Sequence, residues 1–156
     1  MFTQKLYVVC HNIRSLHNVG SIFRTADAAG VTRLYLCGYT GYPPRKEISK
    51  VALGAEKAVP WEYHFHTWQV LERLKLQGVQ IVALENYPQL PSIDFRQFQP
   101  QCPVALLLGN EVNGLSPALL KRADHIVHIP MYGRKESLNV AVAFGIAVYE
   151  LNHQRR

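Results

Sequence analysis

The stretch PVALLLGNEVNGLS, residues 103–116, passes in one step from apolar residues to polar, turn-forming ones. The run that ends at Leu108 is typical of a buried strand. Glycine, asparagine and glutamate follow at 109–111, and the pair Asn113-Gly114 predicts a turn. Ligands of open α/β sheets bind outside the carboxyl ends of strands, so 109–114 is a candidate ligand site. The plainer alternative is a strand-to-helix turn, in which Ser116 N-caps a helix beginning at Pro117.

Similar short apolar runs recur on both sides of this stretch, at 5–10, 31–37, 79–85 and 125–130. Helical patterns lie between them, at 18–30, 67–78 and 136–154, and the first two end in glycine, as helix C-caps do. Alternating strands and helices predict an α/β fold with a mainly parallel sheet flanked by helices. A length of 156 residues favours one domain.

The composition narrows the class of partner. A net charge of +6 and a pI of about 9.4 favour a polyanion such as nucleic acid. Cys10, Cys37 and Cys102 lie far apart with no CxxC pair, so neither a metal site nor a disulfide framework is expected. The amino-terminal apolar run is too short for a signal peptide, and no run approaches the roughly 20 apolar residues of a membrane span. We therefore expect a soluble, cytoplasmic protein without membrane association.

The segment HNVGSIFRTADAAG, residues 17–30, is the first of two further candidate segments. Asn18, Gly20 and Ser21 are expected where a loop becomes a helix, and free backbone N–H groups there can hold a phosphate. Arg24 follows about one turn later, on the same side as Gly20, and its guanidinium can fork onto a phosphate oxygen. The alternative is an ordinary N-cap with a solvated arginine.

The second is HIPMYGRKESLNVAVAFGIAVYE, residues 128–150. A strand ending in Ile129-Pro130 precedes a basic loop and a helix whose first turn is expected to hold Ser137 and Asn139. The interior of this helix is apolar on nearly every side, so the helix must be covered all round. A subunit interface would cover it, and so would a central position in the core.

Three segments in this order, NVGSIFRTA, LLLGNEVNGLS and IPMYGRKESLNVAVAFGIAVYE, closely resemble the signature motifs of the SpoU family. This family comprises ribose 2′-O-methyltransferases of RNA within the knotted SPOUT class. The motifs run from near residue 18 to near residue 150, so the resemblance covers essentially the whole chain. It implies a single SpoU-type domain over 1–156, without the N-terminal RNA-binding extension of some members. It also implies a deep trefoil knot near the C-terminus.

The resemblance further implies that the chain binds S-adenosylmethionine, with no metal. Main-chain groups around the end of the third apolar run, the 109–114 turn and the segment before the last helix match the family's cofactor positions. The residues concerned are Leu84, Gly109, Asn110, Ile129, Met131, Ser137 and Leu138.

The catalytic residues that the resemblance implies are Arg24, Asn18, Glu111, Ser137 and Asn139. The methyl donor is already activated, so the enzyme's task is alignment and removal of the hydroxyl proton. Arginine rarely gives up its own proton, so we expect Arg24 to clamp the phosphate beside the ribose and to stabilise the alkoxide. Glu111 would orient Arg24 or the RNA, or would instead hold the knot loop through backbone N–H groups.

The implied partners are RNA, transfer RNA in preference to ribosomal RNA, and a second copy of the chain. Loop 38–47, rich in proline, tyrosine and basic residues, is a candidate RNA contact. The residues expected to position RNA through its phosphates are Arg14, Arg24, Arg45, Lys46 and Arg134. Two other classes of protein stay open: a catalytically silent RNA-binding module of the same fold, and a nucleotide-binding α/β protein unrelated to RNA.

Overall fold

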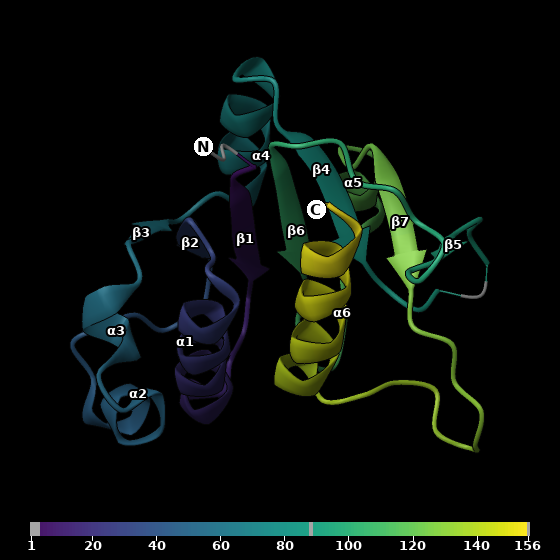
Figure 1. The fold of residues 1–156 in the computed structure, drawn as a ribbon. Coiled ribbons are helices and arrows are strands. Elements are labelled where there is room, and N and C mark those ends of the chain that lie inside the picture. The colour runs from purple at the N-terminus through teal and green to yellow at the C-terminus, as the bar shows by residue number, and fades with distance from the viewer. Residues whose placement is uncertain (1–3, 88, 156) are drawn as a thin grey trace.

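A computed structural model describes residues 4–87 and 89–155 and contains a seven-stranded sheet (Figure 1). Every paired strand is parallel to its neighbour, in the order β3-β2-β1-β6-β4-β7-β5. The strands are β1 (Leu6–His11), β2 (Arg33–Cys37), β3 (Trp61–His64), β4 (Gln80–Leu84), β5 (Ile93–Asp94), β6 (Val104–Leu108) and β7 (His125–His128). The predicted mainly parallel α/β sheet is confirmed.

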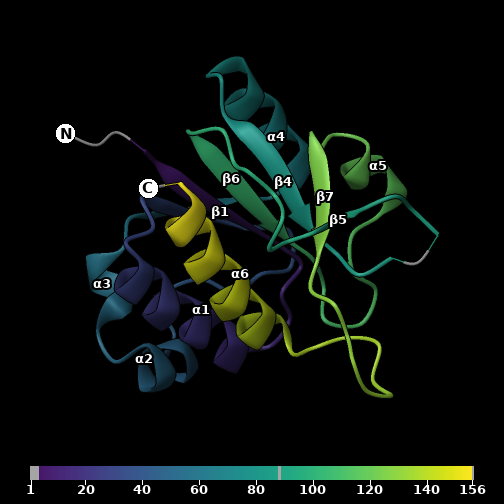
Figure 2. The same ribbon diagram turned by 45° about the vertical axis from the view of Figure 1, so that its right-hand side comes forward.

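Helices cover both faces of the sheet, which explains why its central strands are mainly apolar (Figure 2). Strand β6 is buried along its whole length. One face packs on α1, α2 and α6, and the other on α4 and α5. The helices are α1 (Leu16–Ala29), α2 (Lys46–Ala52), α3 (Ala55–Ala58), α4 (Thr67–Leu76), α5 (Pro117–Leu120) and α6 (Val140–Gln154).

Helix α1 begins earlier than its sequence suggested. Ser15 is the N-cap and accepts the backbone N–H of Asn18, so Asn18, Gly20 and Ser21 lie inside the helix. The predicted loop-to-helix junction at these residues is therefore wrong. Gly20 has a packing role instead, because a Cβ atom there would lie 2.7 Å from the carbonyl oxygen of Ile48 in α2. The predicted C-cap at Gly30 is confirmed, with φ of 71°.

Helix α6 begins later than expected. Asn139 is its N-cap and Ser137 precedes it, so neither residue lies in the first turn as predicted. Phe144, Ala147, Val148 and Leu151 pack against the sheet and α1. The outer face exposes Val142, Ile146 and Tyr149, so α6 is not a helix covered all round within one copy of the chain.

Strands β3 and β5 and helices α2 and α3 were not expected from the sequence. Strand β3 is a four-residue edge strand and β5 has two residues, so neither produces a long apolar run. Helices α2 and α3 occupy part of the segment between β2 and β3, beside α1. Within the described ranges, no helix is both long and apolar enough to cross a membrane.

Because all the strands are parallel, their carboxyl ends share one edge of the sheet. The turn after β6 and the segment between β7 and α6 both start at that edge (Figure 1). The trefoil knot that the resemblance implies stays a prediction.

Candidate active site

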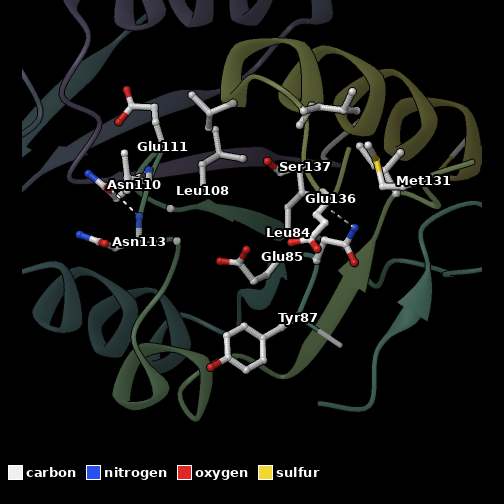
Figure 3. A pocket seen from close by; sticks show the side chains of 18 residues that line it. Leu84, Glu85, Tyr87, Leu108, Asn110, Glu111, Asn113, Met131, Glu136 and Ser137 are labelled. Atoms are coloured by element: carbon white, nitrogen blue, oxygen red, sulfur yellow. Dashed lines mark hydrogen bonds between the residues drawn. The ribbon is translucent and has the colours of Figure 1, made fainter. Parts of the chain in front are cut away.

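A cavity of about 320 Å³ opens where β4, β6 and β7 end (Figure 3). All seven residues expected to bind the cofactor line it: Leu84, Gly109, Asn110, Ile129, Met131, Ser137 and Leu138. Two residues expected to be catalytic, Glu111 and Ser137, also line it. The structure thus brings the second and third sequence motifs to one cavity, although they are separated along the chain.

The turn after β6 forms one wall of the cavity. The side-chain oxygen of Asn110 accepts the backbone N–H groups of Val112 and Asn113, at 2.9 and 2.8 Å. Gly114 completes the turn with φ of 64°, a conformation that strongly favours glycine. A Cβ atom on Gly109 would lie 2.7 Å from the carbonyl carbon of Gly114, so the returning turn fills the space beside Gly109. The predicted turn at Asn113-Gly114 is confirmed, and so is the N-cap at Ser116.

Glu85 follows β4 and contributes a carboxylate that was not expected from the sequence. In Figure 3 this carboxylate lies toward the middle of the cavity. One of its oxygens accepts the backbone N–H of Leu115 at 2.8 Å and lies against Gly114. Burial raises the pKa of Glu85 above its ordinary value, and hydrogen bonds from backbone N–H groups oppose that rise only in part. Glu85 is the polar residue that closes the run 79–85, much as Gly109 follows Leu108, and the same reasoning could have found it.

The Glu111 carboxylate points away from the middle of the cavity, toward the segment before α1 (Figure 3). It accepts the backbone N–H groups of Arg14 and Ser15, at 3.0 and 3.1 Å, and the side-chain amide of Asn18 at 3.2 Å. Partial burial alone would raise the pKa of Glu111, but these hydrogen bonds outweigh it and hold the pKa below its ordinary value.

Asn18 continues this network to the third motif. Its side-chain oxygen accepts the amide of Asn139 at 3.1 Å. The Asn139 oxygen in turn caps α6 by accepting the N–H groups of Ala141 and Val142. A chain of hydrogen bonds therefore joins Glu111, Asn18 and Asn139, one residue from each motif.

Three expected catalytic residues do not line the cavity: Asn18 and Asn139, which reach Glu111 only through the hydrogen bonds above, and Arg24. Arg24 is exposed on α1, and its side chain makes no hydrogen bond or ion pair with another described residue. The structure therefore does not show Glu111 orienting Arg24. Glu111 holds backbone N–H groups, as the alternative expected, but these belong to the segment before α1.

The other basic residues expected to contact RNA, Arg14, Arg45, Lys46 and Arg134, are all exposed. Arg45 and Lys46 stand at the start of α2, where Arg45 lies 3.7 Å from Glu47. Arg134 lies between β7 and α6, in the segment that lines the cavity. These positions leave the guanidinium and ammonium groups open to solvent.

The cavity is acidic, although the chain is basic as a whole. Glu85, Glu111 and Glu136 line it, and among the described residues no lysine, arginine or histidine does. The negative charge of these carboxylates thus suits the cavity to a ligand that carries positive charge.

Comparison with known proteins gives the family. Residues 5–149 match the SpoU rRNA methylase family. The chain is 39% identical to tRNA (guanosine(18)-2′-O)-methyltransferase of Aquifex aeolicus, over 96% of this chain and 70% of that enzyme.

Two solved structures resemble the whole described fold. The SpoU methyltransferase AviRb from Streptomyces viridochromogenes, in complex with the cofactor AdoMet, superposes with a TM-score of 0.89 at 28% identity, covering 99% of this chain and 59% of that one. A structure described as giving insights into the 2-OH methylation of C/U34 on tRNA has a TM-score of 0.86 at 28% identity, covering 97% and 96%.

Fold and cavity thus define an α/β protein of the SPOUT class, with a ligand cavity at the carboxyl ends of parallel strands. The chain belongs to the SpoU rRNA methylase family and is an RNA methyltransferase of that type. The resemblance drawn from the three motifs is confirmed.

Proposed function

We propose that the chain transfers a methyl group from S-adenosylmethionine to a ribose 2′-hydroxyl of RNA, with transfer RNA as the substrate. The observation that carries this proposal is the acidic cavity built by the second and third motifs and joined by hydrogen bonds to the first. A transfer RNA substrate is supported by the Aquifex relative and by the solved structure that concerns tRNA. Such a substrate also implies a cytoplasmic location.

The residues of the cavity fit the cofactor. S-adenosylmethionine supplies an activated methyl group on a positively charged sulfonium. Glu85 and Glu136 give the cavity negative charge, which favours a cation. The backbone around Ile129 and Leu138, together with the turn after β6, would hold the adenosine. Ser137 and Asn110 add polar groups to the same wall, so the seven lining residues are our proposed cofactor site.

The remaining task of the protein is to hold the RNA and to ease loss of the hydroxyl proton. The exposed guanidinium of Arg24 binds the phosphate beside the target ribose and stabilises the developing alkoxide with its positive charge. Asn18, Glu111 and Asn139 act as positioning residues, since their hydrogen bonds fix the start of α1 against the cavity and α6. Arg14, Arg45, Lys46 and Arg134 contact further phosphates without reading sequence.

We also propose that the chain works as a homodimer. The outer face of α6 leaves Val142, Ile146 and Tyr149 exposed, at 52, 41 and 53%. These residues follow one another at spacings of four and three, so they form one stripe. A second copy of the helix would cover this stripe.

The test combines a cofactor titration with mapping of the modification. Calorimetry should detect binding of S-adenosylmethionine by the folded protein. Mass mapping of 2′-O-methylribose should find one transfer RNA position that is methylated only in cells with an active gene. If the folded protein binds neither the cofactor nor its demethylated product, the proposed methyltransferase activity is excluded. If the modification maps to ribosomal RNA instead, the proposed substrate is wrong but the proposed reaction stands.

A further inference from the structure

A second cavity, of about 480 Å³, lies beside the first at the same edge of the sheet. It is bounded by the end of β1, the segment after β2 and the turn after β6. Asn110, Asn113 and Gly114 line both cavities, so the turn after β6 is a shared wall. The other lining residues are His11, Asn12, Arg14, Tyr39 and Ser116.

This cavity occupies a distinctive place in the topology. Chain order runs outward from β1 through β2 to β3 on one side, whereas β6, β4, β7 and β5 lie on the other (Figure 1). The intervening helices also change face there, with α1 on one face and α4 and α5 on the other. Open parallel sheets bind ligands in the crevice at such a switch point.

The floor of the second cavity is held rigidly. Asn12 has a positive φ of 55°, and its side-chain oxygen accepts the backbone N–H of Tyr39 at 2.8 Å. The amide of Asn110 donates to the carbonyl of Asn12, also at 2.8 Å. The ring of His11 lies 2.7 Å from the Thr67 hydroxyl oxygen, and burial lowers the pKa of His11 below its ordinary value.

Three side chains at the rim of the second cavity, those of Tyr39, Arg14 and Asn113, are free to contact a ligand. The Tyr39 ring is 76% exposed. Among the described residues, the side chains of Tyr39, Arg14 and Asn113 have no hydrogen-bond partner, whereas those of Asn12, His11 and Asn110 do. A flat aromatic face, an amide and a guanidinium are the groups that proteins use for the base, base edge and phosphate of single-stranded RNA.

We propose that the second cavity holds a nucleobase of the RNA substrate. Tyr39 stacks on the base, Asn113 hydrogen-bonds its edge, and Arg14 pairs with the adjoining phosphate. The inference rests on the proposed function, because it places the RNA next to the cofactor cavity. The shared wall at Asn110–Gly114 then sets the spacing between this base and the reacting ribose.

The charges favour a base within a polymer over a free nucleotide. The backbone N–H groups of Arg14 and Ser15, which could otherwise hold a terminal phosphate, already donate to the Glu111 carboxylate. That carboxylate also repels a doubly charged phosphate. A phosphodiester carries a single charge, which Arg14 can match.

The test compares Tyr39→Leu with Tyr39→Phe, which keeps the ring. Phe65→Leu serves as the control, because Phe65 is a similarly exposed aromatic residue, at 69%, that does not line the cavity. Binding of unfractionated transfer RNA is measured by filter retention, and binding of S-adenosylmethionine by calorimetry. We expect Tyr39→Leu to weaken RNA binding about tenfold, as loss of one base–aromatic stack does. Tyr39→Phe and Phe65→Leu should stay within about twofold of the wild type, and cofactor affinity should be unchanged in all variants.

RNA binding by Tyr39→Leu that equals the wild type would overturn the proposal. So would competition by 5′-mononucleotides at micromolar concentration, since this would mark the cavity as a site for a free nucleotide. Failure of the proposed function would be seen separately. A wild-type protein that binds RNA but never methylates it would rule out the methyltransferase activity, while the Tyr39 variants would still show whether the second cavity binds a base.

Discussion

Two glutamates that follow neighbouring strands have opposite surroundings. Glu85 lies in the proposed cofactor cavity, and burial raises its pKa. Glu111 accepts three hydrogen bonds from the segment before α1 and from Asn18, which together keep its pKa low despite partial burial. The first carboxylate is therefore available to a ligand, whereas the second is committed to the fold.

Replacing Glu111 with glutamine should therefore change stability in a pH-dependent way. Because the folded pKa lies below the ordinary value of 4.5, the stabilisation by the carboxylate is present above pH 4.5 and is lost as the pH falls through the folded pKa. We expect Glu111→Gln to lower the free energy of unfolding by about 1–2 kcal/mol at pH 7, the low end of the range for hydrogen bonds to charged groups, because Glu111 is only partly buried. Urea unfolding at pH 7 and near pH 3 measures this; an equal loss at both values would contradict the assignment.

Glu85→Gln should weaken binding of S-adenosylmethionine more than binding of its demethylated product, which lacks the sulfonium charge. We expect a difference of about fivefold, since one partly screened charge pair contributes on the order of 1 kcal/mol. In the wild type the same preference should fade as the pH falls through the raised pKa of Glu85, because the carboxylate is then protonated. Calorimetry with both ligands tests this, with the exposed Glu47→Gln as the control. Equal losses for both ligands would exclude a charge effect.

Arg24→Ala should abolish methyl transfer but leave cofactor affinity nearly unchanged, because Arg24 does not line the cofactor cavity. The expected fall in rate is roughly a hundredfold or more, typical for loss of one charge-stabilising donor. Arg24→Lys should rescue poorly, since lysine lacks the planar fork. Single-turnover methylation of bulk transfer RNA, beside a cofactor titration, measures both effects. Near-normal turnover in Arg24→Ala would remove this residue from the site.

At the level of elements, the contact between α1 and α2 depends on the glycine at position 20, whereas the contact between α1 and α6 leaves room beside Gly145. A Cβ atom on Gly20 would lie 2.7 Å from the Ile48 carbonyl oxygen and 2.9 Å from the Val51 Cβ, so α1 and α2 meet there backbone to backbone. A Cβ atom on Gly145 of α6 would come no closer than 3.8 Å to Thr25. There is therefore no room for a methyl group at Gly20, whereas there is room for one at Gly145.

Gly20→Ala should destabilise the protein by about 1–3 kcal/mol through overpacking, even though alanine favours helix. Gly145→Ala is the matched control, and it should be neutral or stabilising by up to about 1 kcal/mol, because the site has room for a methyl group. Thermal or urea unfolding of both variants measures the two changes in stability. A Gly20→Ala protein as stable as the Gly145→Ala protein would mean that α2 can move away from α1 without cost.

At the scale of the whole molecule, the sequence predicted the centre of the sheet better than its edges. Strands such as β6 are buried on both faces, so they appear as continuous apolar runs, whereas the edge strand β3 has the polar sequence WEYH. The three motifs identified the cavity residues, but the contacts between motifs join residues 93 and 121 positions apart. Periodicity describes only local structure, so it could not show that Glu111 holds the start of α1 or that Arg24 lies outside the cavity.

Assembly is the remaining property at this scale. The exposed stripe on α6 predicts that Ile146→Glu will convert a dimer into a monomer, because it places a charge at the centre of a surface that a second copy must cover. Leu76→Glu is the control, since Leu76 is an 89% exposed apolar residue at the end of α4, away from this stripe. Light scattering at micromolar concentration should give the mass of two chains for the wild type and Leu76→Glu, and of one chain for Ile146→Glu. A monomeric wild type would reject the dimer, and a dimeric Ile146→Glu would place the interface elsewhere.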